Sequence, residues 1–218
     1  MSTPAGENAL VQAAQNGDVE AFNALVRRYQ DIAYTVAYRV MGEPEAAADA
    51  TQEAFIAAFR KLRQFRGPNF RAWLLRIVTN ACYDELRRRQ RRPSVSLDAL
   101  ATPPRPTADP SPLHTPPESP EAHAERRELH DAIQECLNAL PAEQRIVAVL
   151  ADVEGYSYQE VAQIARLRLG TVKSRLSRAR ARLRECLQAV RELLPAAYRL
   201  KDKPTRGESA PPQDTQGL

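Results

Sequence analysis

The chain has 218 residues, enough for one or two domains, and its formal net charge is only +4. No apolar run approaches the ~20 residues that cross a bilayer, and the first ten residues lack the basic segment and apolar core of a secretory signal. We therefore expect a cytoplasmic protein with no membrane insertion.

Amphipathic helices are predicted throughout residues 7–92, which we treat as a first domain. Apolar side chains recur every three or four positions between Phe22 and Val40. A second helix is expected to start at Pro44, and a third to follow the turn sequence Gly-Pro-Asn at 67–69. The apolar face of the second helix is predicted to use Ala50, Phe55, Ile56, Phe59 and Leu62.

Charge is distributed unevenly along this domain. Residues 42–53 carry four acids and no base, whereas residues 60–92 carry eleven Lys or Arg against two acids. Five of these arginines, between Arg87 and Arg92, end the third helix. Cations are favourable at a helix C-terminus, but five exceed what the helix dipole requires, so phosphate contact is the preferred interpretation. The acidic helix face indicates a different partner.

Two segments have compositions that cannot bury a core. Residues 93–120 are dense in Pro, Ser, Thr and Ala and show no periodicity, so we expect a semi-extended linker. Residues 194–218 have a similar composition and are predicted to be a disordered tail. The chain should therefore be all-α, with two helical domains joined by a tether.

The second domain, residues 121–193, is predicted to hold four helices that end in a helix-turn-helix. Ser157 and Glu160 form a capping-box signature at the start of one helix. A short break follows, and then a strongly basic helix, with eight Lys or Arg and no acid in residues 166–184. Its apolar stripe consists of Val172, Leu176, Ala179, Leu183 and Leu187. A basic coiled coil or a solvated helix is the alternative, but charge of one sign along a helix favours a polyanionic partner.

Catalysis and metal binding are not indicated. Cys82, Cys136 and Cys186 are odd in number, far apart and embedded in helical patterns, so we expect neither a disulfide framework nor a zinc site. His114, His123 and His130 have no acid partner at diagnostic spacing, and no Gly-rich phosphate loop is present. We expect a protein that is not an enzyme and needs no metal or cofactor.

The order of these motifs resembles the extracytoplasmic-function (ECF) group of bacterial RNA polymerase sigma factors. The resemblance covers about residues 9–92 and 125–190, from "DATQEAFIAAFRKLRQFRG" and "FRAWLLRIVTNACYDELRRRQRRP" to "LPAEQRIVAVLADVEGYSYQEVAQIA" and "GTVKSRLSRARARL". It implies a region 2-like domain before the linker and a region 4-like domain after it. The sequence departs from the pattern of the group at two places. In the turn of the helix-turn-helix it has Ala165, Arg166 and Arg168 where members of the group usually carry Leu-Gly and often Pro. The loop before the third helix is one residue shorter than in many members.

The resemblance implies that the first domain binds core RNA polymerase, on the clamp of the largest subunit, through Asp49, Gln52 and Glu53. It also implies that this domain reads the minus-ten promoter element as a separated strand. The candidate residues are Phe65, Asn69, Phe70 and Asn80 for the bases and Arg87, Arg88 and Arg91 for the backbone. Asn80 could equally bond a neighbouring backbone carbonyl, and Trp73 is expected to be a core residue rather than a stacking wedge.

The second domain is then expected to place its basic helix in the major groove of the minus-thirty-five element. Arg175 and Arg178 are the predicted base-reading residues. The expected phosphate contacts are Lys173, Ser174, Arg180 and Arg182. Thr171 is a further DNA-binding candidate, since a residue of that size allows close approach to the DNA.

Many members of the group are held inactive by an anti-sigma factor, which is a further candidate partner. A dimeric helix-turn-helix regulator that binds duplex DNA without polymerase is the main alternative function, and an antagonist that mimics a sigma factor is another. The second arginine cluster and the acidic face of the first domain argue against the regulator, and the intact basic helix argues against the antagonist.

Overall fold

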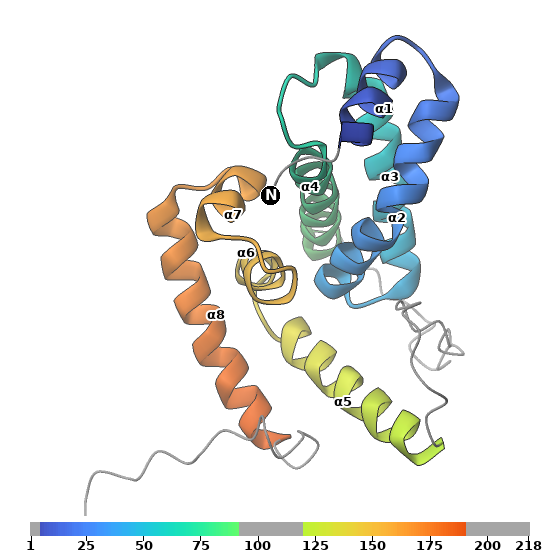
Figure 1. Cartoon of the computed structure of the whole chain (residues 1–218). Helices are drawn as coiled ribbons and strands as arrows, with labels where there is room; N and C mark the ends of the chain where they lie inside the picture. The colour runs from blue at the N-terminus through green and yellow to red at the C-terminus, as the bar shows by residue number, and fades with distance from the viewer. Residues whose placement is uncertain (1–4, 92–119, 191–218) are drawn as a thin grey trace, which may run out of the picture.

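The computed structural model describes residues 5–91 and 120–190, and within these ranges all regular structure is helical (Figure 1). This confirms the all-α prediction. The predicted linker, apart from Pro120, and the whole of the predicted tail lie outside the described residues. None of the helices described is long and apolar enough to cross a membrane.

The first half of the chain forms four helices and a short 3₁₀ turn. These are α1 (Ala5–Gln15), α2 (Val19–Met41), α3 (Pro44–Lys61), η1 (Leu62–Gln64) and α4 (Phe70–Arg91). Asp18 starts α2 because its carboxylate accepts a hydrogen bond from the backbone N–H of Ala21 at 3.0 Å. Gly42 ends α2 in the left-handed conformation, at φ 79°. Pro44 then opens α3, as the sequence predicts.

The second half forms a second helical bundle. Its elements are α5 (Pro120–Asn138), α6 (Ala142–Ala148), which continues into the π-helical turn η3 (Val149–Val153), then α7 (Tyr158–Ala165) and α8 (Leu169–Ala189). The predicted capping box is present, since the Ser157 and Glu160 side chains each accept a backbone N–H of the other residue. The helix-turn-helix turn places Arg166 in the left-handed region at φ 53°, a conformation that glycine adopts without strain.

Alanines bring α3 close to its neighbours. Ala46, Ala47, Ala50, Ala54 and Ala58 are buried along one side of the helix, with α2 and α4 as its main neighbours. The larger side chains Ile56 and Phe59 are 44% and 50% exposed. The prediction that they belong to the buried face of this helix was therefore wrong. The small residues occupy the core side because they allow the closest helix approach.

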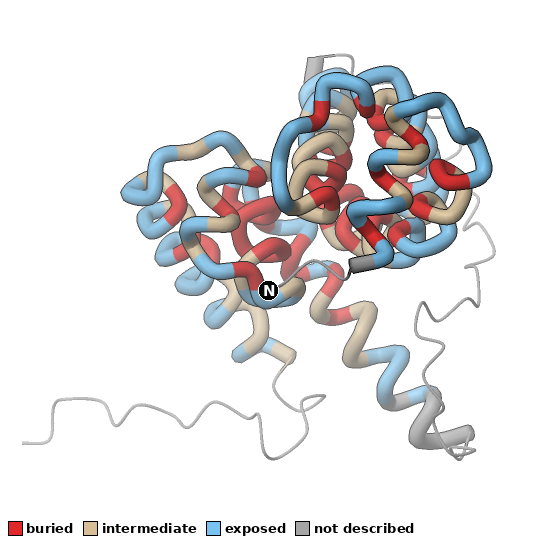
Figure 2. Tube along the Cα trace, turned by 45° about the horizontal axis from the view of Figure 1, so that its top comes forward, coloured by how far each residue is buried: buried red, intermediate tan, exposed pale blue. Residues whose placement is uncertain are grey.

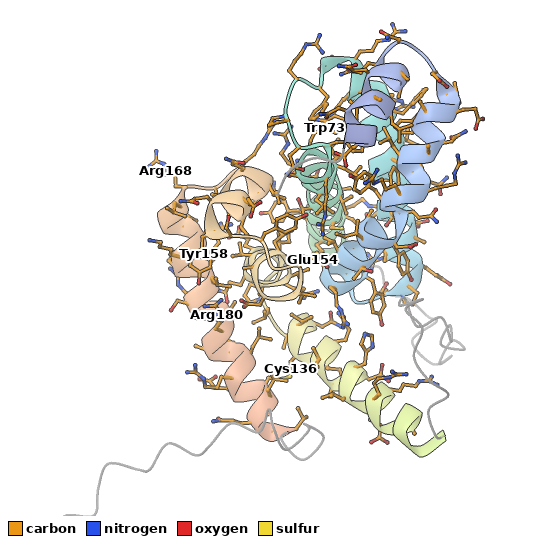
Figure 3. The ribbon with its side chains drawn as sticks, in the orientation of Figure 1. Trp73, Cys136, Glu154, Tyr158, Arg168 and Arg180 are labelled. Carbon is orange, nitrogen blue, oxygen red and sulfur yellow. A yellow bond between two sulfur atoms is a disulfide. The ribbon has the colours of Figure 1, made fainter. Side chains whose placement is uncertain are left out.

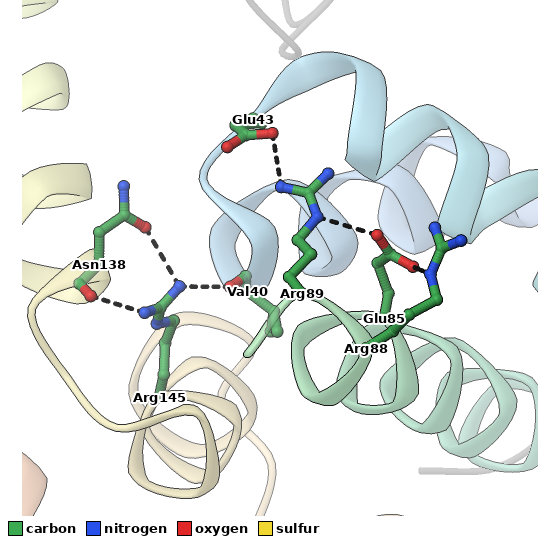
Figure 4. A network of polar contacts seen from close by, with 7 residues as sticks. All are labelled: Val40, Glu43, Glu85, Arg88, Arg89, Asn138 and Arg145. Atoms are coloured by element: carbon green, nitrogen blue, oxygen red, sulfur yellow. Dashed lines mark hydrogen bonds and ion pairs between the residues drawn. The ribbon is translucent and has the colours of Figure 1, made fainter. Parts of the chain in front are cut away.

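The two halves pack against each other in a closed arrangement. Helix α4 lies against α6 and α7, and the end of α2 lies against α5 and η3 (Figures 1 and 2). The buried apolar side chains of both halves form one continuous cluster. Arg145 of α6, itself buried, donates hydrogen bonds to the carbonyls of Val40 and Asn138, each at 2.6 Å (Figure 4). It also donates to the carbonyl of Leu140 at 3.1 Å.

A disulfide joins Cys136 of α5 to Cys186 of α8. The prediction that the cysteines form no disulfide was wrong for this pair, because helix packing brings together residues that are 50 positions apart. Cys82 is a free, buried thiol in the first half, as expected of a core residue. Among the residues described, no group of His, Cys, Asp or Glu could hold a metal ion.

Candidate nucleic-acid and protein interfaces

Helix α8 presents a basic outer face above a buried stripe. Val172, Leu176 and Ala179 are buried against the second bundle, as the periodicity predicts. Lys173, Arg178 and Arg182, three of the predicted DNA-contacting residues, are exposed on the outer face. Arg168, at the turn before the helix, points away from the body of the molecule (Figure 3). This surface can approach a polyanion without any rearrangement.

Two of the predicted DNA-contacting arginines are paired with acidic residues of the second bundle. Arg175 forms an ion pair with Glu143, at the start of α6. Arg180 bonds both oxygens of Asp152, at 2.6 and 3.1 Å, and the hydroxyl of Tyr158 at 3.1 Å (Figure 3). The bond to Asp152 is the main reason why the pKa of Arg180 is raised. Both arginines therefore hold helices together in this arrangement.

The two smaller candidates, Thr171 and Ser174, lie about one turn apart near the start of α8. The Ser174 hydroxyl donates to the carbonyl of Thr171 at 3.0 Å, and Thr171 is half-buried. A Ser hydroxyl bonded one turn back is common in helices.

The loop before α4 is closed by an aromatic cluster. Phe65 and Phe70 are only 8% and 1% exposed, and their ring centroids lie 5.8 Å apart. Trp73 packs on both rings, at 5.0 and 5.5 Å, and is half-buried, which agrees with the expected core role. Asn69 accepts the backbone N–H of Ala72 at 2.9 Å, so it caps the helix. The two Phe rings would have to leave the core before they could contact a separated base.

Helix α4 exposes a different set of polar groups. Asn80 is exposed in the middle of the helix, and Arg87 is exposed over the ring of Tyr83, at 6.0 Å. Arg88 bonds Glu85 at 2.7 Å, and Arg89 bridges Glu85 and Glu43 at 2.9 and 2.7 Å (Figure 4). The bonds from these two arginines lower the pKa of Glu85. Arg91 ends the helix, and its side chain lies outside the described residues.

An apolar groove of about 1050 Å³ runs between α2 and α3. The large apolar side chains that line it are Val19, Phe22, Val26, Tyr34, Phe55, Ile56 and Phe59. Gln52, one of the three predicted polymerase-binding residues, lines the groove. Asp49 and Glu53 are exposed on the same helix beside it. Sequence reasoning missed Ile56 and Phe59 as surface residues, although the competing alanine stripe of α3 was visible in the sequence.

Polar contacts span the two halves. Tyr83 of α4 donates to Glu143 at 3.2 Å, and Glu143 is the partner of Arg175. Arg71 of α4 lies 3.8 Å from Glu154 and stacks over the ring of Tyr156 at 5.2 Å. Burial raises the pKa of Glu154. The helix with the minus-ten candidates is thus partly covered by the second half.

Two family models match the chain. The Sigma-70 region 2 family matches residues 25–92, which extend from α2 to the end of α4. The Sigma-70 region 4 family matches residues 130–183, which contain the helix-turn-helix.

Curated relatives match over most of the chain. ECF RNA polymerase sigma factor SigE of Mycolicibacterium smegmatis is 35% identical and covers 81% of this chain, which spans 65% of that relative's length. RNA polymerase sigma-H factor of Pseudomonas aeruginosa is 35% identical, with 86% of this chain and 97% of the relative covered. ECF RNA polymerase sigma-E factor of Escherichia coli K12 is also 35% identical, with 83% and 93% covered.

Two solved structures are similar. CnrH in complex with the cytosolic domain of CnrY has a TM-score of 0.58 and 30% identity, with 84% of this chain and 98% of CnrH covered. The sigma factor RpoE, in complex with the anti-sigma factor NepR from Bartonella quintana, has a TM-score of 0.56 and 29% identity, with 76% and 96% covered.

Proposed function

The chain belongs to the ECF group of RNA polymerase sigma factors, and on this premise we propose how its surfaces direct transcription initiation. It is an alternative sigma factor. Residues 7–92 bind core RNA polymerase and the minus-ten element, and residues 121–193 bind the minus-thirty-five element. The protein acts in the cytoplasm as a binding factor and catalyses no reaction of its own.

The groove between α2 and α3 is the proposed docking site for core polymerase, on the clamp of its largest subunit. Ile56 and Phe59 are large apolar residues left half exposed at this groove. Exposed apolar surface next to polar residues is typical of protein–protein sites. Gln52 and the neighbouring Asp49 and Glu53 supply the polar rim. This exposed apolar groove is the observation that carries the proposal.

The outer face of α8 is the proposed reader of the minus-thirty-five element. In this proposal Arg178 makes the base contact and Lys173 and Arg182 contact phosphates, which is supported by the exposure of all three side chains. Arg175 would first have to leave Glu143. On α4, Asn80, Arg87 and Arg88 are exposed candidates for the minus-ten element, and Arg88 is also paired with Glu85.

An anti-sigma factor is a proposed inhibitory partner. The similar solved sigma factor RpoE is bound to one, NepR. The groove and the outer face of α8 are the surfaces of this chain that such a partner would have to cover.

Run-off transcription with purified core polymerase on a pool of genomic promoters tests the function. We expect new start sites that depend on the chain and share two upstream elements. No such transcripts, together with tight binding of the isolated chain to palindromic duplex DNA, would instead identify a polymerase-independent regulator.

A groove variant tests the docking site. Ile56→Asp and Phe59→Asp should each lower the affinity for core polymerase by about tenfold or more, because burial of one such side chain contributes roughly 1.5–3 kcal/mol. Val153→Asp is the matched control, since Val153 is an exposed apolar residue outside the groove, 47% accessible. Equal loss of affinity in the control would contradict the assignment.

A further inference from the structure

The disulfide bonds the recognition helix α8 to α5, the helix with which the described part of the second half begins (Figure 3). Cys136 is only 2% exposed, whereas Cys186 is half-buried, so an external reagent reaches the sulfur of Cys186 first. The third cysteine, Cys82, is buried, and burial raises its pKa to about 12. A thiol of that kind exchanges poorly, which leaves the 136–186 pair as the accessible sulfur chemistry of the chain.

The same segment of α5 holds the first half of the molecule. Gln134 accepts a hydrogen bond from the guanidinium of Arg39 at 3.2 Å and donates one to the carbonyl of Arg39 at 3.3 Å. Asn138 covers Gly42 at the end of α2 so closely that a Cβ at Gly42 would overlap its amide. Cys136 lies between Gln134 and Asn138 in the sequence of α5. The disulfide therefore restrains the turn of α5 that contacts α2.

We propose that Cys136 and Cys186 form a reversible thiol–disulfide site whose oxidised form holds the two halves of the chain in the closed arrangement. Reduction frees the end of α5 from α8 and weakens the contacts of Gln134 and Asn138 with α2. The inference rests on the proposed function for the redox state of the compartment and for the effect on DNA binding. A factor that works with polymerase on DNA meets a thiol pool that reduces most disulfides, and disulfides found there are usually redox-sensing.

The exchange needs only a small thiol and its disulfide. A thiolate attacks Sγ of Cys186, the S–S bond breaks, and Cys136 leaves as a thiolate that takes up a proton. A second thiol then attacks the sulfur of the small molecule in the mixed disulfide, which releases Cys186. The sum is one protein disulfide and two small thiols giving two protein thiols and one small disulfide, a two-electron change that runs backward when the small disulfide is in excess.

Closure affects the DNA-reading surfaces directly. Helix α4, which carries Asn80 and Arg87, packs against α6 and α7. Tyr83 of the same helix bonds Glu143, the partner of Arg175. The disulfide favours the closed arrangement. It therefore disfavours simultaneous binding of the two halves to two separate promoter elements.

Small-angle X-ray scattering of the full chain tests the switch without polymerase or DNA. The protein is equilibrated with glutathione disulfide or with dithiothreitol, and free thiols are counted by alkylation and mass spectrometry. We expect the reduced protein to have a larger radius of gyration and faster amide exchange at the end of α2. The double variant Cys136→Ser/Cys186→Ser should match the reduced protein in both buffers, and Cys82→Ser should behave as the wild type.

Identical scattering and exchange of oxidised and reduced wild type would overturn the proposal, and so would alkylation that shows no reversible change at residues 136 and 186. These outcomes need no variant to fold, since both states are the natural chain. Run-off transcription is then compared in the two buffers, with an expected gain on reduction of about fivefold or more, the lower range for coupled sites. Transcripts that are equal in both buffers contradict the switch, whereas no transcripts in either buffer, with the scattering change present, contradict the proposed function instead.

Discussion

The guanidinium of Arg145 in α6 donates a hydrogen bond to the carbonyl of Val40 at the end of α2, 2.6 Å away and buried between the two halves of the chain (Figure 4). The same side chain also satisfies the carbonyls of Asn138 and Leu140. One residue is therefore the donor for three backbone carbonyls near helix ends, and the bonds to Val40 and Leu140 are buried. Burial lowers its pKa, but an arginine remains charged at any physiological pH.

We predict that Arg145→Ala lowers the free energy of unfolding by about 2–4 kcal/mol, because buried carbonyls are left without donors. Arg145→Lys should recover only part of the loss, since an ammonium group cannot reproduce the planar fork. Urea unfolding followed by circular dichroism measures the difference. Arg127→Ala, at an exposed position of α5, is the control and should unfold as the wild type. An unchanged urea midpoint for Arg145→Ala would show that this residue does not stabilise the contact between the two halves.

Substitution of Gly42 and of Gly17 by Ala should distinguish the cost of backbone strain from the cost of steric overlap. Both have positive φ, at 79° and 100°, but only Gly42 has a neighbour, Asn138, where a Cβ would be placed. Gly17→Ala should cost about 1 kcal/mol from backbone strain alone. Gly42→Ala should cost more, and Asn138→Ala in the same chain should recover the excess. Thermal unfolding of the four proteins checks this, and equal costs for the two glycine variants would contradict the close contact.

Arg178 and Arg180 should respond oppositely to substitution. Arg178→Ala should weaken binding to the minus-thirty-five duplex by about 1–3 kcal/mol if it reads a base, with the stability of the protein unchanged. Arg180→Ala should mainly lower stability, by less than about 1 kcal/mol, because its bond to Asp152 is largely solvent-exposed. Fluorescence anisotropy with labelled duplex and urea unfolding distinguish the two effects. The assignments would be reversed if Arg178→Ala lost stability. They would also be reversed if Arg180→Ala lost DNA binding strongly while its stability stayed unchanged.

We predict that Glu154 and Glu85 affect the pH dependence of stability in opposite directions. Burial raises the pKa of Glu154 above its value in the unfolded chain, so the folded state binds this proton more tightly. The free energy of unfolding therefore decreases as pH rises from the unfolded pKa to the folded pKa of this group. Glu154→Gln should therefore be more stable than the wild type at neutral pH, and the gain should shrink as pH falls through the folded pKa and disappear below the unfolded pKa.

Glu85 has the opposite sign. Its hydrogen bonds from Arg88 and Arg89 lower its pKa, so its contribution is present above the unfolded pKa and is lost as pH falls through the folded one. Glu85→Gln should be less stable at neutral pH and equal to the wild type in acid. Urea midpoints measured between pH 3 and pH 8 test both variants, and parallel curves for the two would contradict the stated causes.

Local patterns in the sequence were sufficient to predict the helices and the family. Ser157 and Glu160 lie three positions apart and form the predicted cap, and Val172, Leu176 and Ala179 form the predicted buried stripe. These features depend on neighbours within one or two turns, so they can be read from spacing alone. The motif order that identifies a sigma factor is also a property of the sequence.

Tertiary packing decided the remainder. Periodicity shows that α3 has two apolar sides, but only the approach of α2 and α4 buries the alanines and leaves Ile56 and Phe59 exposed. Arg175 and Arg180 were predicted to bind DNA, and only the folded bundle shows Glu143 and Asp152 beside them. The bond between Cys136 and Cys186 joins residues 50 positions apart. Contacts of this kind have no local signature, because each depends on where other helices place the partner.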